Sequence, residues 1–328
     1  MSNVNLVEVS SGDAGMRLDR WFRTHYPALK HGQLQKLLRT GQIRVDGGRA
    51  KANARLEEGQ TVRVPPMDRA TAKAETSAAG ISLDDARFVQ SLVIHKDDRV
   101  LAINKPPGLA VQGGTKTRRH LDALLDGLKF KESERPRLVH RLDKDTSGVL
   151  LLARDRKTAA ALGDALKARE ATKTYWGLIK GVPSPDRGEI ALPLIKKGGA
   201  QAERMHVADE DEDDAQHAVS RYAVIDVAGR KFCWAALWPL TGRTHQLRVH
   251  MAAIGHPIIG DGKYGGQDAH PGGEIGNMLH LHAREIDIPH PAGGRLKVSA
   301  PLPEHMLKTW KLLNFDPKLA MDEFEGAV

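Results

Sequence analysis

Apolar residues near the start of the chain recur at helical spacing. In "RLDRWF", Leu18, Trp21 and Phe22 lie three and four residues apart, and "GQLQKLLRTG" places its leucines on one face before a glycine suited to a helix end. "QIRVDGGRAK" then has the strand, Asp-Gly turn and strand of a hairpin, and "EEGQTVRVPP" adds a strand closed by prolines. The pattern predicts a small α/β unit over residues 16–66, preceded by a flexible N-terminus over 1–15.

A polar stretch follows this unit. Residues 67–87 begin with "MDRATAKAETSAAG", which is rich in Ala, Thr and charge and has no apolar period, so we expect a linker. From Phe88 onward, strand patterns alternate with helical patterns. "RVLAINKP", "SGVLLLAR" and "TKTYWGLIKG" are typical of strands, and "RKTAAALGDALKARE" of an amphipathic helix. "SRYAVIDVA" and "KFCWAALWPL" indicate two consecutive antiparallel strands.

Long strand patterns with few helices between them run over residues 88–316. They predict an α+β domain, built on a mixed, mainly antiparallel β-sheet with flanking helices. Within it, "THQLRVHMAAIG" returns to helical spacing, with Thr244 as the expected N-cap. The acidic run from Asp209 to Asp214 would repel itself, which predicts a solvated loop. Residues 317–328 are expected to form a C-terminal tail.

The composition favours a water-soluble protein. The chain has 328 residues, of which 41% are hydrophobic, enough for roughly two domains. No uninterrupted apolar stretch approaches a membrane span, and the N-terminal sequence lacks a secretory pattern, so we expect a cytoplasmic protein without a membrane partner. The single cysteine, Cys233, excludes an internal disulfide and a cysteine-based zinc cluster.

Positive charge gathers at the start of the chain. The net charge is +8, and the first 66 residues hold eleven Lys and Arg against six Asp and Glu. This distribution indicates a basic module for a polyanionic partner. A soluble helical surface without a partner is the alternative.

Several stretches look like cofactor or metal motifs, but none matches the pattern that such a site requires. "GLAVQGGTKT" has the composition of a phosphate-binding loop, but its residues are out of register with that motif, and no dinucleotide-binding glycine pattern occurs. His245, His250, His280 and His282 could suggest zinc, yet they fit one helix face and one strand face without the usual partner residues. We therefore expect neither a cofactor nor a metal.

The stretch "HRLDKDTSG" concentrates charge directly before the buried run "VLLLAR". Its carboxylates are Asp143 and Asp145. A carboxylate that acts as a nucleophile or base must be ionised and held in a sheltered place, and a nearby arginine favours the ionised form. Asp143 precedes a tight turn into the strand, which would fix its position. The alternative is that either aspartate caps the turn, as aspartates often do.

Five motifs in order resemble the RluA-type pseudouridine synthases. They are "LAINKPPGLAVQGG", "HRLDKDTSGVLLLAR", "KTYWGLIKG", "TGRTHQLRVHMAAIGHPIIGDGKYG" and "LHLHAREIDIPHP", spread from Val93 to about Pro301. The basic N-terminal unit, with "RLDRWF", "KLLRTGQIRVDG" and "LEEGQTVRVP", resembles the small RNA-binding module named after small-subunit ribosomal protein four. Its place is the one expected in the RluC/RluD branch of the family.

The resemblance implies the pseudouridine synthase fold and the isomerisation of uridine to pseudouridine in large-subunit (23S) ribosomal RNA. It implies no cofactor and a monomer. Two alternatives stay open: a synthase that acts on transfer RNA, and a non-catalytic RNA-binding factor for ribosome assembly.

The resemblance also implies roles for individual residues. Asp143 would be the catalyst, either by covalent attack on the nucleoside or by proton abstraction from the sugar, and Asp145 would not be catalytic. Tyr175 would stack on the uracil ring and is a candidate general base. Arg248 would pair with Asp143, and Arg141 would fill the space left by an extruded base.

Further residues are expected to support the site or to bind RNA. Lys105 would support the site, and His140 and Leu142 would pack beside it. The expected RNA-binding residues are Arg17, Arg20, Lys36, Arg39, Arg44 and Arg243, which would contact phosphates and carry little sequence information.

Overall fold

A computed structural model of the chain describes residues 4–10, 12–26, 29–66, 81–113, 119–198, 204–209 and 212–319. The chain divides into two compact units, Met1–Gly80 and Ile81–Val328, and each is described by itself. Most of the predicted linker, much of the predicted tail and part of the acidic run lie outside the described residues.

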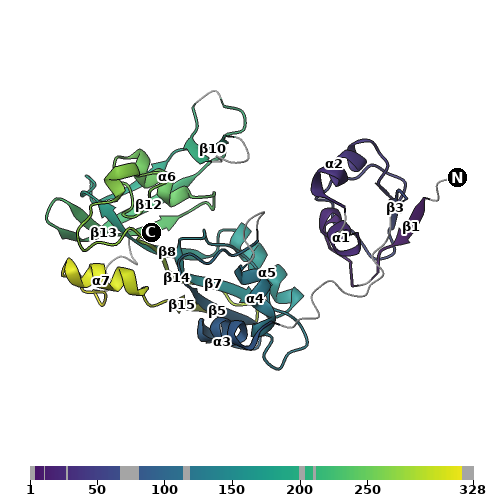
Figure 1. Cartoon of the computed structure of the whole chain (residues 1–328), viewed down its shortest axis with the longest axis horizontal. Coiled ribbons are helices and arrows are strands. Elements are labelled where there is room, and N and C mark those ends of the chain that lie inside the picture. Colours follow the sequence, from purple (N-terminus) through teal and green to yellow (C-terminus); the bar gives the residue numbers. More distant parts are fainter. Residues whose placement is uncertain are drawn as a thin grey trace. The chain divides into compact units, whose positions relative to one another are not determined.

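The N-terminal unit combines two helices with a small antiparallel sheet (Figure 1). The strand order is β1-β3-β2. The elements are β1 (Asn5–Glu8), α1 (Leu18–His25), α2 (His31–Arg39), β2 (Arg44–Val45) and β3 (Thr61–Val64). Gly41, directly after the end of α2, has a φ of 71°, which is the left-handed conformation that the sequence pattern predicts.

The first strand of this unit was not expected. β1 pairs with β3 in antiparallel register, and Val7 and Val9 are buried with Trp21 and Phe22. The prediction of a flexible segment over 1–15 is therefore wrong for residues 5–8. Within β1 only Val7 is buried, and Val9 follows the strand, so the sequence shows no clear alternation.

The larger unit is built on a ten-stranded sheet with the main order β4-β5-β7-β14-β8-β13-β12-β9, in which β15 pairs with β14 and β6 with β7. β7 and β14 run parallel, and the other pairs are antiparallel. The predicted fold class, a mixed and mainly antiparallel sheet with flanking helices, is confirmed. The strands are β4 (Val93–Lys96), β5 (Val100–Lys105), β6 (Arg137–Leu138), β7 (Ser147–Ala153), β8 (Thr172–Lys180), β9 (Arg187–Ala191), β12 (Val219–Ala228), β13 (Phe232–Pro239), β14 (Leu281–Pro289) and β15 (Arg295–Ser299).

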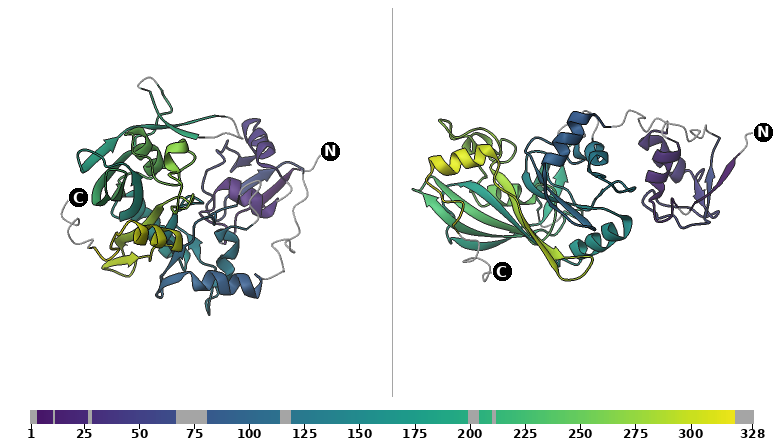
Figure 2. Two further views of the ribbon diagram at one scale, coloured as in Figure 1. Left: turned by 60° about the vertical axis from the view of Figure 1, so that its left-hand side comes forward. Right: turned by 90° about the horizontal axis from the view of Figure 1, so that it is seen from below.

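Helices cover both faces of this sheet. They are α3 (Leu83–Ser91), α4 (Leu121–Leu124), α5 (Arg156–Lys167), α6 (Gln246–Ala253) and α7 (Glu304–Leu312), with 3₁₀ turns η1 (Leu125–Leu128) and η2 (Gly266–Ala269). Figure 2 shows α3 and α5 on opposite faces. Alternate residues of β7 divide accordingly: Leu150 and Leu152 pack with α3, and Leu151 packs with α5. No helix among the described residues is long and apolar enough to cross a membrane.

The larger unit begins earlier than the sequence predicts. We expected the linker to extend to residue 87, but α3 starts at Leu83, and the Ser82 hydroxyl caps it by accepting the N–H of Asp85 at 3.1 Å. Ile81 and Val89 pack into the core beneath the helix. The polar residues of the exposed helix face concealed this short amphipathic pattern.

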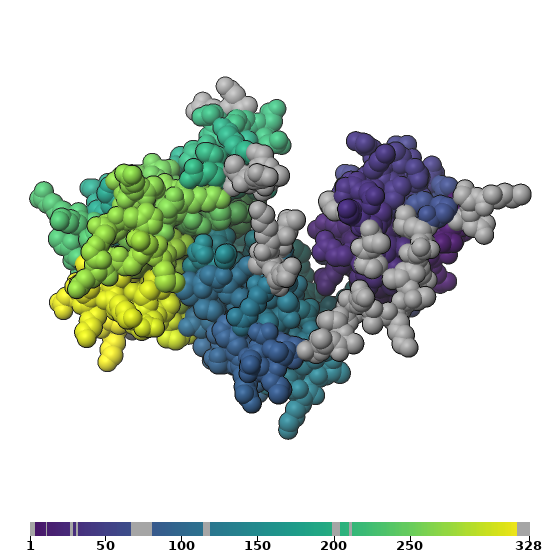
Figure 3. All heavy atoms as spheres, viewed as in Figure 1, coloured from purple at the N-terminus to yellow at the C-terminus, as the bar shows by residue number. Residues whose placement is uncertain are grey.

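A separate hairpin extends from the larger unit. It consists of β10 (Leu194–Lys197) and β11 (Arg204–Val207), which pair in antiparallel register, and it projects from the body in Figures 1 and 3. Glu212, from the acidic run, lies 2.9 Å from the Lys197 ammonium. Met205 contributes to the small core beneath the hairpin.

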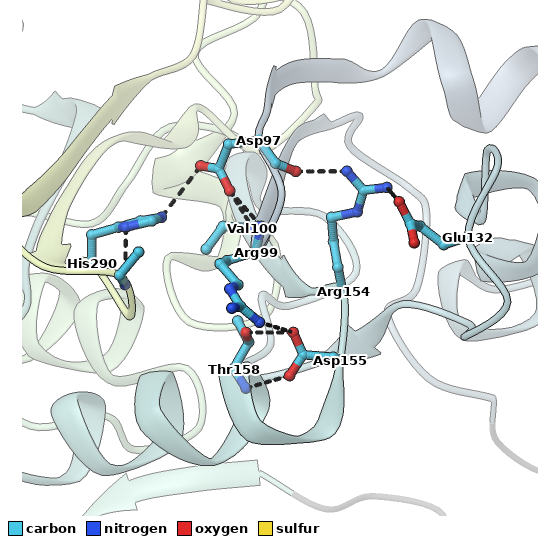
Figure 4. A network of polar contacts seen from close by, with 9 residues as sticks. Asp97, Arg99, Val100, Glu132, Arg154, Asp155, Thr158 and His290 are labelled. Carbon is cyan, nitrogen blue, oxygen red and sulfur yellow. Dashed lines mark hydrogen bonds and ion pairs between the residues drawn. The ribbon is translucent and has the colours of Figure 1, made fainter.

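A polar network joins the ends of β5 and β7 to the start of α5 (Figure 4). Asp97 accepts the backbone N–H groups of Arg99 and Val100, both at 2.7 Å, and its carbonyl accepts the Arg154 guanidinium at 2.6 Å. His95 lies 2.6 Å from the Asp97 carboxylate. Burial raises the pKa of Asp97, but these hydrogen bonds outweigh it and lower the pKa to about 2.

We predict that Asp97→Asn lowers the free energy of unfolding by about 1 kcal/mol at neutral pH. The folded-state pKa lies below the ordinary value of 3.8, so this stabilisation is present above pH 3.8 and is lost as the pH falls through about 2. Urea unfolding followed by tryptophan fluorescence should therefore show a constant difference at neutral and mildly acidic pH. Asp98→Asn, at the exposed neighbour, is the control and should change little. Equal effects of the two substitutions would contradict the assignment.

Candidate active site

The loop that carries Asp143 is held on both sides of that residue. Before it, Leu142 is buried in the apolar core beneath α3. After it, the Lys144 carbonyl accepts the Gly108 N–H at 2.9 Å and the Lys105 ammonium at 2.9 Å. The Asp143 side chain keeps 22% of its surface exposed. The carboxylate is thus fixed through its neighbours and stays accessible.

Lys105, at the end of β5, is fully buried, and its ammonium binds backbone rather than a carboxylate. Nζ donates to the carbonyls of Pro106, Leu109 and Lys144, each at 2.9 Å. Burial lowers the pKa of Lys105 to about 8, while the charges of Asp145 and Asp143 act in the opposite direction. The three bonds use all the hydrogens of the ammonium, so this lysine ties the "KPPGL" loop to the Asp143 loop.

His140 braces the same loop from its other end. Its Nε2 accepts the backbone N–H of Leu151 at 3.0 Å. Burial and the nearby Lys173 ammonium lower the pKa of His140 to about 4, so the ring is neutral at neutral pH. A neutral ring is what an acceptor at Nε2 requires.

The sheet brings Tyr175 to this loop. Gly148 on β7 is opposite Ala283 on β14, and Ala283 is opposite Tyr175 on β8. Gly148 has a φ of 113°, and a Cβ there would overlap the Ala283 carbonyl, so only glycine lets these strands approach. Burial and the charge of Asp143 raise the pKa of Tyr175. The hydroxyl is therefore protonated at neutral pH.

α6 approaches Asp143 from another direction, and Gln246 fixes its first turn. The Gln246 amide oxygen accepts the Thr241 hydroxyl at 2.6 Å and the Arg243 N–H at 3.0 Å, and its nitrogen donates to Val219 O at 2.8 Å. The helix starts one residue later than predicted. The N-cap position belongs to His245, in a left-handed conformation, rather than to Thr244.

Arg248 on α6 forms a buried pair with a partner that we did not expect. Its Nε and Nη2 donate to the two carboxylate oxygens of Asp261 at 2.8 and 2.7 Å. The side chains keep 8% and 1% of their surfaces exposed. Arg248 thus makes this bidentate bond in place of the predicted pairing with Asp143, because both carboxylate oxygens of Asp261 face its guanidinium. Arg248 and Asp143 still interact electrostatically over a longer distance.

His245 occupies the place next to Asp143. Its Nε2 lies 3.8 Å from the carboxylate Oδ2, and its Nδ1 lies 2.6 Å from the Tyr264 hydroxyl. The sequence indicates His245 only as a possible zinc ligand or a helix-face residue and gives no role to Tyr264 or Asp261, although all three lie in the motif "TGRTHQLRVHMAAIGHPIIGDGKYG". The "GDGKYG" turn, an aspartate between glycines, was the available signal.

Asp143, Tyr175 and Arg248 thus bring a carboxylate, an aromatic ring and a buried cation together at one solvent-accessible site. Comparison with known proteins decides what such a site is. The family description of RNA pseudouridylate synthases matches residues 99–253, which include Asp143, Tyr175 and Arg248. Ribosomal large subunit pseudouridine synthase C of Escherichia coli is 32% identical over 92% of this chain and 94% of its own length.

The chain belongs to the RluA-type pseudouridine synthases. Another relative, RNA pseudouridine synthase 4, mitochondrial, of Arabidopsis thaliana, is 34% identical over 95% of this chain and 82% of its own length. Among solved structures, human RNA pseudouridylate synthase domain containing 4 has a TM-score of 0.59 and 29% identity, covering 70% of this chain and 96% of that one. The protein is therefore an RNA pseudouridine synthase.

The other predicted site and RNA-binding residues of this synthase differ in how far their side chains are exposed and in whether they bond to a neighbour. Arg141 is exposed beside Asp143. Arg243 is exposed, and its Nε donates to His217 O at 3.0 Å. In the N-terminal unit, Arg17 pairs with Asp19, and Arg44 donates to two backbone carbonyls. Arg20, Lys36 and Arg39 are exposed.

Two of the histidines that could have suggested zinc, His280 and His282, are buried packing residues of the synthase. His280 lies 2.8 Å from the Thr309 hydroxyl, and His282 lies 2.9 Å from the Ser147 hydroxyl. Burial lowers the pKa of each to about 4. Within the described ranges, no group of three or more His, Cys, Asp or Glu side chains could hold a metal ion.

Proposed function

We propose that this synthase isomerises uridine to pseudouridine in large-subunit ribosomal RNA, with Asp143 as the catalytic residue. The relatives named ribosomal large subunit pseudouridine synthase C support the substrate, because they match the chain nearly from end to end. The single observation that supports the catalyst is the position of Asp143. Its carboxylate is accessible, yet it is carried by a loop that Lys105 and Leu142 fix. We expect the enzyme to act as a monomer in the cytoplasm.

Asp143 would act as an ionised carboxylate. Covalent attack on the nucleoside and abstraction of a proton from the sugar both require this form. The fixed loop supports either route, since a reacting group must stay within a few tenths of an ångström of its productive position.

Tyr175 would hold the uracil while its glycosidic bond is broken and remade at carbon. A half-buried ring beside Asp143 can stack on the base, which is worth about 1–3 kcal/mol. The raised pKa of Tyr175 disfavours the phenolate. For Tyr175 to act as a general base, the negative charge of Asp143 would first have to be removed. Covalent attack by Asp143 on the nucleoside would remove it.

Arg141 would compensate for the extrusion of the uridine. A stacked base must leave its helix at a cost of a few kcal/mol, and a planar guanidinium can stack in the vacated space. Arg141 is exposed and follows directly on the braced His140, so its side chain is available while its backbone is held.

We predict that Asp143→Asn abolishes pseudouridine formation and leaves folding and RNA binding largely intact. The neutral amide has nearly the same shape as the carboxylate but cannot act as a nucleophile or base. Asp145→Asn, at the exposed neighbour, is the matched control and should retain activity. The measurement is pseudouridine formation on transcripts of large-subunit ribosomal RNA and of transfer RNA. An active Asp143→Asn would refute the catalyst, and product on transfer RNA alone would refute the substrate.

We also propose that the exposed cations of the N-terminal unit bind RNA phosphates. A triple variant, with Gln in place of Arg20, Lys36 and Arg39, should weaken RNA binding. The slope of the logarithm of affinity against the logarithm of salt concentration should fall by about 2–3, since each lost phosphate contact removes about 0.7–0.9.

The control for this variant removes three exposed cations of the larger unit, with Gln in place of Arg87, Lys167 and Lys311. Its salt slope should change less. Identical slopes for the two variants in a binding titration would count against a dedicated RNA-binding role of the N-terminal unit.

A further inference from the structure

His245 has an unusual backbone for a residue with a side chain. Its φ and ψ are 54° and 19°, in the left-handed region that glycine favours. Strain of this kind persists where the surroundings hold a side chain in a required place. At His245, the held side chain lies between Asp143 and Tyr264.

A chain of hydrogen bonds favours one tautomer of the His245 ring. The backbone N–H of Met205, on β11, donates to the Tyr264 hydroxyl oxygen at 3.2 Å. The hydroxyl hydrogen is then free to be donated to His245 Nδ1, 2.6 Å away. With Nδ1 as the acceptor, the hydrogen of a neutral ring is on Nε2, the nitrogen that faces Asp143.

Burial is the main reason why the ring of His245 is neutral. Burial lowers its pKa, and the cations Arg248 and Lys263 act in the same direction, against Asp143 and Asp261. Those groups face the ring from α6, from the turn that follows Ile259 and from the Asp143 loop. At neutral pH the ring is therefore uncharged, and its Nε2 faces the Asp143 carboxylate.

We propose that His245 is a positioning residue for Asp143. In the uridine-bound enzyme, its Nε2–H donates to Oδ2 of Asp143 and leaves Oδ1 to react, and Tyr264 fixes the tautomer that makes this possible. The inference rests on the proposed function, because it needs Asp143 as the catalyst. The 3.8 Å separation is longer than a hydrogen bond and would close when the nucleoside fills the site.

This role differs from that of Arg248. The guanidinium of Arg248 is used by Asp261, whose Oδ1 also accepts the N–H groups of Lys263 and Tyr264, both at 3.1 Å. The Arg248–Asp261 pair thus builds the turn that carries Tyr264. Tyr264 in turn orients His245, and His245 orients Asp143.

The test compares two substitutions of His245 that have similar size. His245→Gln keeps an N–H donor, whereas His245→Met does not. We expect the Gln variant to keep kcat within about tenfold of the wild type and the Met variant to lose at least about a hundredfold, with KM nearly unchanged. His256→Gln is the control, because the ring of His256 bonds to the Lys180 carbonyl at 2.9 Å and lies outside the site.

The pH profile separates positioning from a merely structural role. Without a donor, the ionised form of Asp143 is less favoured, so the acidic limb of kcat should move to higher pH in His245→Met. Tyr264→Phe should shift this limb in the same direction by a smaller amount, since the tautomer is no longer fixed. A structural role would lower the amount of folded enzyme and leave the limb in place.

Two failures can be told apart. If Asp143→Asn is inactive while His245→Met has the wild-type kcat and an unmoved acidic limb, the role of His245 is refuted and the proposed catalyst stands. If Asp143→Asn is active, the proposed catalyst itself is refuted, whatever the His245 variants do.

Discussion

The buried ammonium of Lys105 is the interaction on which the site depends. Three backbone carbonyls converge on it, from the "KPPGL" loop and from the residue that follows Asp143. A protonated lysine has three hydrogens on its ammonium, one for each of these carbonyls. Because a buried cation without such partners would be costly, the loops and the lysine hold one another in place. The Asp143 loop is therefore an extension of the sheet rather than a free connection.

The sheet then sets the distance from Asp143 to the other groups. The parallel approach of β7 to β14 at Gly148 places Tyr175 two strands away from the Asp143 loop. α6 contributes Arg248, whose guanidinium is bonded to Asp261 and is therefore not available to pair with Asp143. A neutral His245 faces the carboxylate instead. Asp143 is thus held through its loop and faces the ring of His245, while the guanidinium of Arg248 bonds to Asp261.

The sequence predicted the sheet well and the contacts within the site less well. Long apolar runs such as "VLLLA" reveal strands because burial on both faces leaves no polar position. β1 and α3 were missed because each buries only a few side chains, which leaves too weak a period. The resemblance to a family indicated Asp143, Tyr175 and Arg248, but it gave Asp143 as the partner of Arg248, where the structure has Asp261. Pairings such as Arg248 with Asp261 depend on how α6 meets the next turn, and no local pattern encodes that geometry.

If Asp143 can react only because Lys105 holds its loop in place, Lys105→Met should impair catalysis. Methionine has a similar length but cannot donate to the three carbonyls, so the loop should loosen while Asp143 is retained. The measurement is the single-turnover rate of pseudouridine formation, at a temperature where circular dichroism shows the variant folded. We predict a rate at least about a hundredfold lower, equivalent to about 2.7 kcal/mol, with RNA affinity unchanged. A folded Lys105→Met enzyme with the wild-type rate would contradict the account.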